Sequence, residues 1–598
     1  MNIPKRIWML LDHKQRRHLI GLQLTSIVMA LSTVGGLAAV VPFFTVLADP
    51  NAIRRNPLLF FAYQRLHFGS EATYVAALGI CFAALVLLSN AVNLLGALAI
   101  NRFALQVGAT LHVRLFEEYL RRDYGFHSQT NSAVLASKLL HETGKVVIGI
   151  LQPGLIFVAN LVTVSFVAIS MAVLNPLVAA AATLGLGASY AVIYTIARRR
   201  LLHNGREESR HSAVRMQLVS ETFGAIKEIT VLDVRDLFVQ RFARESRSIA
   251  KAELSTLAVS LSPKSVLECA TVFCLVAVAL YLRSRSNGVG PWVAQLSFIG
   301  FAAYRMLPAL HQAFNASVRI RANRPALDHV AADLGNVLTA SARVAVTPSA
   351  SDRSQRLPCK GVLLHEVSFS YSPDRPAAIS NLSLEIRAGT SVGLVGGNGS
   401  GKTTFTDLLA GLLLPQSGHI DVDGIQLDEL TRRAWQASIA YVPQHVFLLD
   451  ASLAENVAFG VPPLRIDHDR LQRAVRLAHL SECVNALPHG YEERLGERGS
   501  RLSGGQRQRL GIARALYRDA TLMIMDEATS ALDMDAEEAI VDMLETLRPG
   551  RTLVSVAHRL GALRHCDMIH ELREGRIVRS GSYRDLHRPQ RAWSLSTQ

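Results

Sequence analysis

One long stretch in the first half of this chain carries no formal charge. No Asp, Glu, Lys or Arg occurs between Lys145 and Arg198, and Asn175-Pro176 interrupts this run. A helix that crosses a lipid bilayer needs about 20 mostly apolar residues, and an Asn-Pro pair is typical of a turn. The stretch therefore predicts two membrane spans joined by a very short connection.

Four further spans are expected on the same grounds, which gives a helical membrane domain of six long transmembrane helices. The runs 19–48 and 72–101 are free of charge. The fifth span joins the short apolar run Cys269–Leu282 to residues before Glu268, and the sixth runs from about Gly288 to beyond Tyr304. Six is an even number, so both ends of this half lie on one side of the membrane.

The distribution of basic residues indicates that this side is the cytoplasm. The N-terminal segment and the connections 102–145 and 198–251 are rich in Lys and Arg, and both connections are helix-periodic. We expect these connections to be spans that continue beyond the bilayer. Four arginines fall on the outside and reduce the cytoplasmic excess of basic residues without reversing it: Arg54, Arg55, Arg283 and Arg285.

The overall composition agrees with a membrane protein. The formal net charge is +15 and 49% of the residues are hydrophobic. A basic balance suits either nucleic acid or an anionic membrane face, and the apolar first half favours the membrane, so we expect no nucleic-acid partner. The first apolar run lacks a small-residue cleavage site, so we expect a retained span rather than a removed signal peptide. The six cysteines include no C-x-x-C pair, so they do not signal a metal site.

Two features of the membrane half allow more than one interpretation. The external segment 56–68 is amphipathic, and it lies either on the outer membrane surface or in an ordinary hairpin connection. Charges inside spans are costly and usually face a cavity or a partner. Arg305 and Lys264 are therefore candidates to contact an anionic substrate; alternatively, they snorkel to the cytoplasmic interface, and Lys264 pairs with Glu268 four residues on.

The second half contains a phosphate-binding pattern. Residues 396–403 read Gly-Gly-Asn-Gly-Ser-Gly-Lys-Thr, after the strand-like run Ser391–Val395 and before an apolar-periodic segment. Glycines let backbone N–H groups surround phosphates, and the following helix directs its positive N-terminus at them. We expect Lys402 to bridge phosphate oxygens and the Thr403 hydroxyl to hold Mg²⁺. The residues expected to contact ATP are Tyr371, Gly396, Gly397, Asn398, Gly399, Ser400, Gly401, Lys402, Thr403 and Thr404.

Tyr371 is the least specific of these positions. It ends the segment Val367–Tyr371, before the phosphate loop. An aromatic ring there could stack on the adenine, although a lone tyrosine is more often part of strand packing.

Two adjacent acids follow an apolar run in Leu522–Glu527. A buried strand that delivers Asp526 to Mg²⁺ is the Walker B arrangement. Glu527 points to the other side of the strand end, where it could orient or deprotonate the attacking water. Such a pair becomes meaningful because a phosphate loop precedes it in the same chain.

Residues 502–506 read Leu-Ser-Gly-Gly-Gln and open a helix. They present a second anion-binding helix N-terminus in a chain that already has a phosphate loop. This duplication predicts that a second copy of the domain faces the first, so that Ser503, Gly504, Gly505 and Gln506 contact ATP in trans.

Together these motifs resemble the ATPase domain of ABC transporters over about 361–586. The resemblance implies an α/β P-loop domain with an antiparallel β subdomain and a helical subdomain that carries Leu502–Gln506. It also implies that Gln444 couples Mg²⁺ to the membrane domain, that His558 contacts the γ-phosphate, and that Asp533 communicates between two ATP sites. Glu527, His558 and Gln444 are thus the catalytic candidates, and Thr403, Gln444 and Asp526 the metal candidates.

Six spans fused to one such domain resemble an exporter-type half-transporter. We expect a transmembrane domain at 1–325, a linker at 326–360 and the ATPase domain at 361–598. The resemblance also implies short cytoplasmic coupling helices near Tyr124–Ser132 and Glu221–Leu232. Two copies of the chain would form the working homodimer in the cytoplasmic membrane, with ATP, Mg²⁺ and membrane lipid as partners and the ATPase domain in the cytoplasm.

The membrane half narrows the resemblance further. Residues 119–132, 224–229 and 304–309 resemble lipid-linked oligosaccharide flippases of the PglK type. This implies ATP-driven flipping of a lipid-linked oligosaccharide or related lipid, with Arg305 and perhaps Lys264 at its pyrophosphate. Export of peptides, drugs or other hydrophobic solutes is the alternative. A non-transporting ATP-gated switch is a weaker third, because every catalytic position follows the family pattern.

Overall fold

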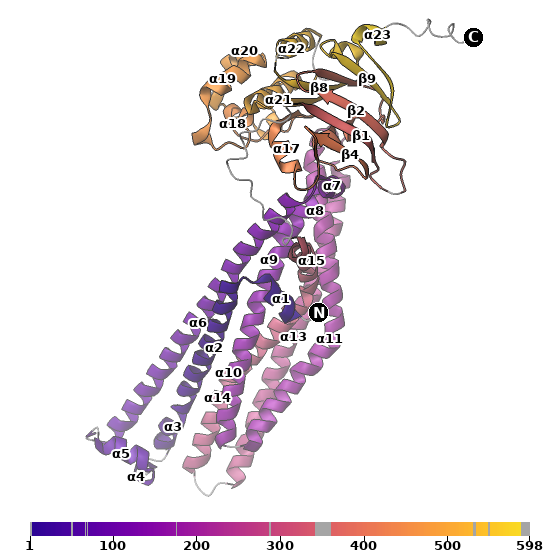
Figure 1. Cartoon of the computed structure of the whole chain (residues 1–598). Coiled ribbons are helices and arrows are strands. Elements are labelled where there is room, and N and C mark those ends of the chain that lie inside the picture. The colour runs from indigo at the N-terminus through magenta and orange to yellow at the C-terminus, as the bar shows by residue number, and fades with distance from the viewer. Residues whose placement is uncertain are drawn as a thin grey trace. The chain divides into compact units, whose positions relative to one another are not determined.

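The computed structural model describes residues 3–48, 52–65, 67–68, 70–174, 176–285, 289–340, 360–372, 374–529, 534–547 and 550–587 (Figure 1). The chain divides into two compact units. One contains Met1–Arg122 and Phe126–Ala345, and the other contains Asp123–Gly125 and Val346–Gln598.

The first half of the chain is helical. Its α-helices are α1 (Ile3–Leu10), α2 (His13–Ala38), α3 (Val40–Ala48), α4 (Ala52–Arg55), α5 (Pro57–Arg65), α6 (Glu71–Arg121), α7 (Tyr124–Gln129), α8 (Ser132–Ser137), α9 (Thr143–Val146), α10 (Gln152–Leu174), α11 (Pro176–Gly224), α12 (Ile226–Val231), α13 (Arg235–Arg285), α14 (Val289–Ala322) and α15 (Arg324–Ala340). Two π-helical turns, η1 (Lys138–Glu142) and η2 (Val147–Leu151), continue the line from α8 to α10.

Long helices occupy the positions of all six predicted spans. By length and composition, three helical stretches within the described residues could cross a membrane, namely His13–Leu47, Glu71–Arg121 and Ser132–Val173. The predicted fourth, fifth and sixth spans coincide with α11, α13 and α14. α6 and α11 also continue through the basic connections, as their periodicity predicted, and the short helices α7 and α12 lie at the two predicted coupling positions.

Close helix packing in this unit depends on small residues at the contacts. α10 packs against α2 and α14, and α11 packs against α13 and α14. Gly205 in α11 lies against the end of α14, where an added Cβ would come within 1.7 Å of the Ala322 carbonyl oxygen. A larger residue at this position would therefore push the two backbones apart.

The predicted linker 326–360 starts with a helix, which the sequence analysis did not anticipate. In α15, Ala326, Leu327 and Val330 are buried in the same apolar cluster as residues of α6 and η2. The Asp333 carboxylate also accepts hydrogen bonds from Tyr119 Oη at 2.8 Å and Lys138 Nζ at 2.9 Å. The start of this segment is therefore part of the membrane unit, and residues 341–359 lie outside the described residues.

The second unit is built on two sheets. Its strands are β1 (Gly361–Phe369), β2 (Ile379–Arg387), β3 (Ser391–Val395), β4 (Ser417–Val422), β5 (Ile425–Gln426), β6 (Ile439–Val442), β7 (Leu522–Asp526), β8 (Thr552–Ala557), β9 (Met568–Arg573) and β10 (Arg576–Gly581). The smaller sheet is antiparallel, with the order β2-β1-β4-β5. The larger has the order β10-β9-β3-β8-β7-β6, and every pair in it except β10–β9 is parallel.

Helices complete this α/β unit. They are α16 (Lys402–Leu409), α17 (Arg432–Ser438), α18 (Leu453–Val457), α19 (His468–Leu477), α20 (Ser481–Ala486), α21 (Gly504–Arg518), α22 (Met534–Leu547) and α23 (Tyr583–His587), with 3₁₀ turns η4 (Pro463–Arg465), η5 (Gly490–Glu492), η6 (Glu497–Gly499) and η7 (Leu560–Leu563). The insertion between β6 and β7 contains α18 to α21, which share an apolar core. The predicted antiparallel and helical subdomains are thus both present.

Candidate nucleotide site

The loop 396–401 joins the buried strand β3 to α16. Its backbone passes so close to neighbouring segments that glycine is required at specific positions. Gly401 has φ +104°, and a Cβ added there would lie 2.4 Å from the Ala378 carbonyl oxygen. A Cβ on Gly396 would lie 2.4 Å from the Leu572 carbonyl oxygen. The loop therefore has the tight curvature that lets successive N–H groups converge on an anion.

Lys402 closes over this loop. Its Nζ donates to the carbonyl oxygens of Gly396 at 3.0 Å and Gly397 at 2.9 Å. Burial lowers the pKa of this ammonium, while the nearby carboxylates of Glu527 and Asp526 act in the opposite direction. The cation is held where a phosphate bound by the loop would meet it.

Asp526 ends the fully buried strand β7. Its Oδ2 accepts hydrogen bonds from Tyr441 Oη at 3.2 Å and from Thr406 Oγ1 at 3.3 Å. Burial raises the pKa of this carboxyl, and both hydrogen bonds oppose the rise. Hydrogen bonds thus orient an acid that is costly to keep ionised in this place, which suits a group that faces a cation.

Glu527 lies at the centre of three predicted catalytic residues. Its backbone has φ +50°, and its N–H donates to the Val556 carbonyl oxygen at 3.0 Å. Its carboxylate accepts a 2.6 Å hydrogen bond from Gln444 Nε2 and lies 2.6 Å from His558 Nε2. The structure therefore brings Gln444, Glu527 and His558 together, although they come from three separate segments.

The oxygen donors here fit Mg²⁺. This ion prefers a small number of carboxylate or hydroxyl oxygens completed by phosphate and water, and Asp526 and the exposed Thr403 supply such oxygens. Because Gln444 uses its amide nitrogen toward Glu527, its amide oxygen is available as a further donor. Among the described residues, no group of three or more His, Cys, Asp or Glu side chains is placed to hold a metal ion.

Tyr371 lies beside the loop helix. Its hydroxyl is 3.3 Å from Thr404 Oγ1, and its ring packs edge-on against Phe369. The ring is partly exposed, so both the stacking and the packing interpretation stay open.

Asp407 is a buried acid that the sequence analysis did not single out. It lies on α16, and burial followed by the charge of Asp526 raises its pKa to about 6. The available signal was a carboxylate inside the apolar segment that follows Thr404, but its proximity to Asp526 follows only from the fold.

Ser503 caps helix α21. Its Oγ accepts from the Gln506 N–H at 3.2 Å, and its own N–H donates to Gln506 Oε1 at 2.9 Å. Both hydrogen bonds join residues of the helix terminus, and neither involves a residue of the phosphate loop. Gly504 also has open space around it, since a Cβ there would meet nothing within 4 Å. Asp533, the fifth residue predicted to contact ATP in trans, lies outside the described residues.

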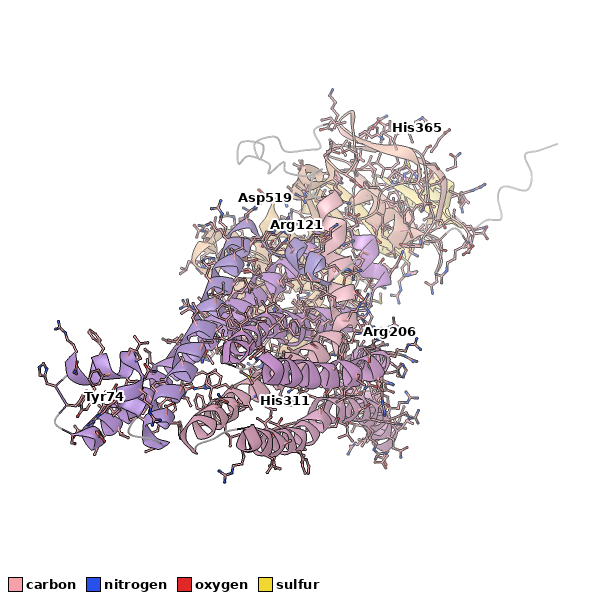
Figure 2. All side chains as sticks on the ribbon, turned by 90° about the horizontal axis from the view of Figure 1, so that it is seen from below. Tyr74, Arg121, Arg206, His311, His365 and Asp519 are labelled. Atoms are coloured by element: carbon pink, nitrogen blue, oxygen red, sulfur yellow. The ribbon has the colours of Figure 1, made fainter. Side chains whose placement is uncertain are left out.

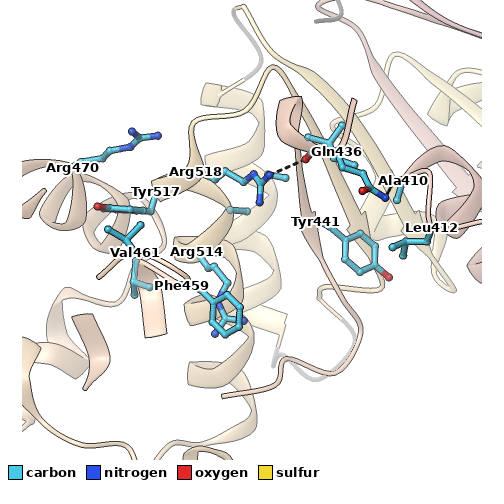
Figure 3. A pocket seen from close by; sticks show the side chains of 14 residues that line it. Ala410, Leu412, Gln436, Tyr441, Phe459, Val461, Arg470, Arg514, Tyr517 and Arg518 are labelled. Atoms are coloured by element: carbon cyan, nitrogen blue, oxygen red, sulfur yellow. Dashed lines mark hydrogen bonds between the residues drawn. The ribbon is translucent and has the colours of Figure 1, made fainter. Parts of the chain in front are cut away.

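A groove of about 590 Å³ lies between the larger sheet and the helical insertion (Figure 3). Arg514 on α21 lines it, donates from Nε to the Asn456 carbonyl oxygen at 2.9 Å, and stacks 4.5 Å from the Phe459 ring centroid. Burial lowers the pKa of this guanidinium to about 10. Arg518 donates to the Gln436 carbonyl oxygen at 2.8 Å, the bond drawn in Figure 3. Arginine and aromatic side chains thus line part of the groove.

The two candidate substrate residues lie in different surroundings. Arg305 donates from Nη1 to Asn90 Oδ1 at 2.9 Å and lies over the Phe301 ring, while its Nε is buried without a hydrogen-bond partner among the described residues. Lys264 is half-exposed and lies 3.9 Å from Glu268, which is the pairing that its spacing indicated. Arg305 is therefore the better candidate for contact with an anionic group.

Comparison with known proteins gives consistent results for both halves. Residues 19–300 match the family model described as ABC transporter transmembrane region, and residues 379–530 match the one described as ABC transporter. An ATP-dependent lipid A-core flippase of Alkalilimnicola ehrlichii is 32% identical over 478 residues, which cover 79% of this chain and 78% of that protein.

Other similar proteins match over different lengths. A protein of the same description from Ralstonia nicotianae is 45% identical over 221 residues, but this match spans only 37% of each chain. The solved structure of a bacterial Atm1-family ABC exporter with ATP bound is 22% identical, covers 96% of each chain and has a TM-score of 0.78. The chain therefore has the fold of that exporter across both halves.

Proposed function

This chain belongs to the ABC transporter family, and from that premise we propose that two copies of it use ATP to move an amphipathic lipid across the cytoplasmic membrane. The observation that carries the proposal is the Glu527 carboxylate, which Gln444 and His558 hold from two sides at 2.6 Å. A residue held this way at the end of a buried strand suits the activation of a water molecule for attack on a phosphate.

The residues of one chain divide the work of hydrolysis. The loop N–H groups and Lys402 would bind the phosphates, and Asp526, Thr403 and Gln444 would hold Mg²⁺, which neutralises charge on the phosphates when bound. Glu527 would take the proton of the attacking water, and His558 would position Glu527 and contact the γ-phosphate.

A second copy of the chain would complete each site. Ser503–Gln506 form a well-capped helix N-terminus with Ser503 exposed, and the hydrogen bonds of its capping groups do not join it to the loop within the described residues of one chain. Such a terminus favours an anion. We expect it, together with Asp533, to contact the ATP held by the loop of the partner chain, so that ATP binding brings the two ATPase units together.

We expect the two coupling helices to transmit the closure of the ATPase units to the membrane unit. The segment around α12 exposes Phe223, Val231 and Leu232 to solvent, which is unfavourable unless another surface covers them. The groove beside Arg514, whose lining includes the rings of Phe459 and Tyr517, is a candidate surface to cover them. We expect α12 of one copy to occupy the groove of the other.

The expected substrate is an anionic glycolipid. Two relatives aligned over most of their length are named lipid A-core flippases, and Arg305 offers a cation within the sixth long helix. The narrower resemblance to lipid-linked oligosaccharide flippases stays a prediction, and so does a role for Lys264. Because the residues expected to catalyse hydrolysis lie together at the site, a non-transporting switch is not favoured.

Reconstitution into proteoliposomes tests this proposal. ATP should drive translocation of a fluorescent phosphorylated glycolipid, and this lipid should stimulate ATP hydrolysis more than hydrophobic peptides or dyes do. Lys402→Ala is the matched inactive control. Stimulation by peptides or dyes but not by glycolipids would overturn the substrate class and leave the ATPase assignment intact.

A mixing experiment tests the shared site. Lys402→Ala and Ser503→Arg chains should each be inactive alone, whereas mixed dimers keep one intact loop and one intact helix terminus facing each other. Partial recovery of ATP hydrolysis on mixing is the expected result. No recovery, with dimer formation verified by cross-linking, would contradict a site built from two chains.

A further inference from the structure

The external helix α5 is fixed in place by an aromatic cluster. Tyr74 of α6 donates from its hydroxyl to the Leu59 carbonyl oxygen at 3.2 Å. The Tyr63 ring packs edge-on against Tyr74 and stacks on Phe68. The Asn56 side chain caps the helix by accepting from the Leu58 N–H at 3.0 Å. α5 is therefore a built element with a defined orientation rather than a loose connection.

This cluster is continuous with the end of the first predicted span. Val46 of α3, Ile53 of α4 and Tyr74 of α6 are buried together, and Leu59 and Tyr63 of α5 pack against them. Tyr74 is labelled in Figure 2 beside the helices of the N-terminal segment. Because α3 and α6 belong to stretches that are long and apolar enough to cross a membrane, we expect α5, which connects them, to lie at the level of the bilayer surface.

The other side of α5 is apolar and uncovered. Leu58 is 80% exposed and Phe61 is 67% exposed, whereas Leu59 and Tyr63 of the same helix are half-buried against the cluster. The segment 52–65 contains Arg54, Arg55 and Arg65 and no acidic residue. A short helix with exposed Leu and Phe beside arginines is typical of an element that lies in a membrane interface, where arginines meet anionic headgroups.

We propose that α5 docks on the membrane surface and inserts Leu58 and Phe61 among the lipids, with the arginines of 52–65 at anionic headgroups. The leaflet is the one opposite the cytoplasm, an assignment that rests on the proposed topology. The docking itself does not depend on which substrate is moved. Docking of α5 would anchor the connection between the first two spans to the bilayer surface.

Spin-label accessibility tests the proposal in the full-length protein. Single cysteines at Leu58 and Phe61 are introduced into a cysteine-free background that retains ATP hydrolysis, and the protein is reconstituted in phosphatidylcholine:phosphatidylglycerol nanodiscs. Leu87→Cys in α6 calibrates an apolar helix surface, and Glu429→Cys on the ATPase unit calibrates water. The ratio of collisions with O₂ to collisions with a water-soluble nickel chelate should be at least about fivefold higher at Leu58 and Phe61 than at Glu429.

Three results would overturn the proposal. A ratio equal to that of Glu429 would show a water-facing helix. Exclusion of both reagents, with dipolar broadening between labels, would show that a second copy covers the face. A ratio that rises only when glycolipid substrate is added would assign the face to the substrate instead of the bilayer.

The charge component has its own test. In nanodiscs of phosphatidylcholine alone, the label at Phe61 should be shallower than in nanodiscs that contain phosphatidylglycerol. The double variant Arg54→Gln, Arg65→Gln should lose this difference. If the depth of the native protein does not respond to phosphatidylglycerol, the arginines do not bind headgroups and that part of the proposal fails.

Discussion

Replacement of Glu527 by glutamine changes one oxygen to a nitrogen at the centre of the site. The carboxylate of Glu527 takes a hydrogen bond from Gln444 on one oxygen and lies against His558 Nε2 with the other. An amide can accept from only one of these neighbours and presents NH₂ to the other. The variant keeps the side-chain volume but loses the negative charge and the ability to accept a proton.

The size of the effect follows from these two losses. General-base catalysis contributes about 10²–10⁴-fold to a rate, so the barrier to hydrolysis should rise by about 3–5 kcal/mol. Removal of an anion near the phosphates relieves repulsion on the order of 2–4 kcal/mol, by Coulomb's law for groups about 4–8 Å apart at an effective dielectric constant near 20. We therefore expect slower hydrolysis without weaker ATP binding, and an ATP-bound dimer that accumulates.

The assay pairs steady-state ATP hydrolysis with retention of labelled ATP on the reconstituted protein. Glu429→Gln makes the same chemical change at an exposed position of the ATPase unit and should match the native protein in both measurements. Hydrolysis by Glu527→Gln at the native rate would refute the base assignment. Slow hydrolysis with lost ATP retention would instead refute the expected balance of charges.

Three further predictions concern stability. Gly401→Ala should destabilise the nucleotide-free protein by about 1–3 kcal/mol, because alanine is strained at the positive φ of this position, and its melting temperature should fall. Gly397→Ala, where a Cβ meets nothing within 4 Å, should leave the melting temperature unchanged. Burial raises the pKa of Asp407 to about 6, so the folded state binds more protons than the unfolded state and the free energy of unfolding falls as pH rises from about 4 to 6. Asp407→Asn removes this charge and should increase the free energy of unfolding by up to about 3 kcal/mol at pH 7.5. The variant should have little effect at pH 4, and thermal unfolding without Mg²⁺ measures both values. Gly205→Ala should cost about 1–3 kcal/mol by overpacking, and an unchanged melting temperature relative to Gly21→Ala, which has open space, would contradict that contact.

Local sequence patterns predicted the membrane spans and the phosphate loop, because the signal for each of them is contained in a short segment. The charge-free run after Lys145 needs only its own length to indicate spans, and Gly396–Thr403 needs only its flanking strand and helix. Such features do not depend on which distant residues come together.

Features that depend on distant contacts were less accessible. Ala326, Leu327 and Val330 have helical spacing, but their burial against α6 and η2 follows only from the tertiary structure. The proximity of Asp407 to Asp526 likewise joins α16 to β7 through the sheet order. The partner surface of Ser503 lies beyond one chain, so the motif predicts it while the structure of a single chain does not test it.

The bond that closes the start of α21 has a consequence for how quickly a neighbour can be engaged. Ser503 Oγ serves Gln506 only as an acceptor, so its own hydroxyl proton is still free to be donated to a phosphate oxygen. An incoming nucleotide would therefore find this donor already oriented, and no turn of helix would have to unwind to release it. The rate of closure would then be limited by the approach of the two ATPase units, and not by rearrangement of the α21 N-terminus.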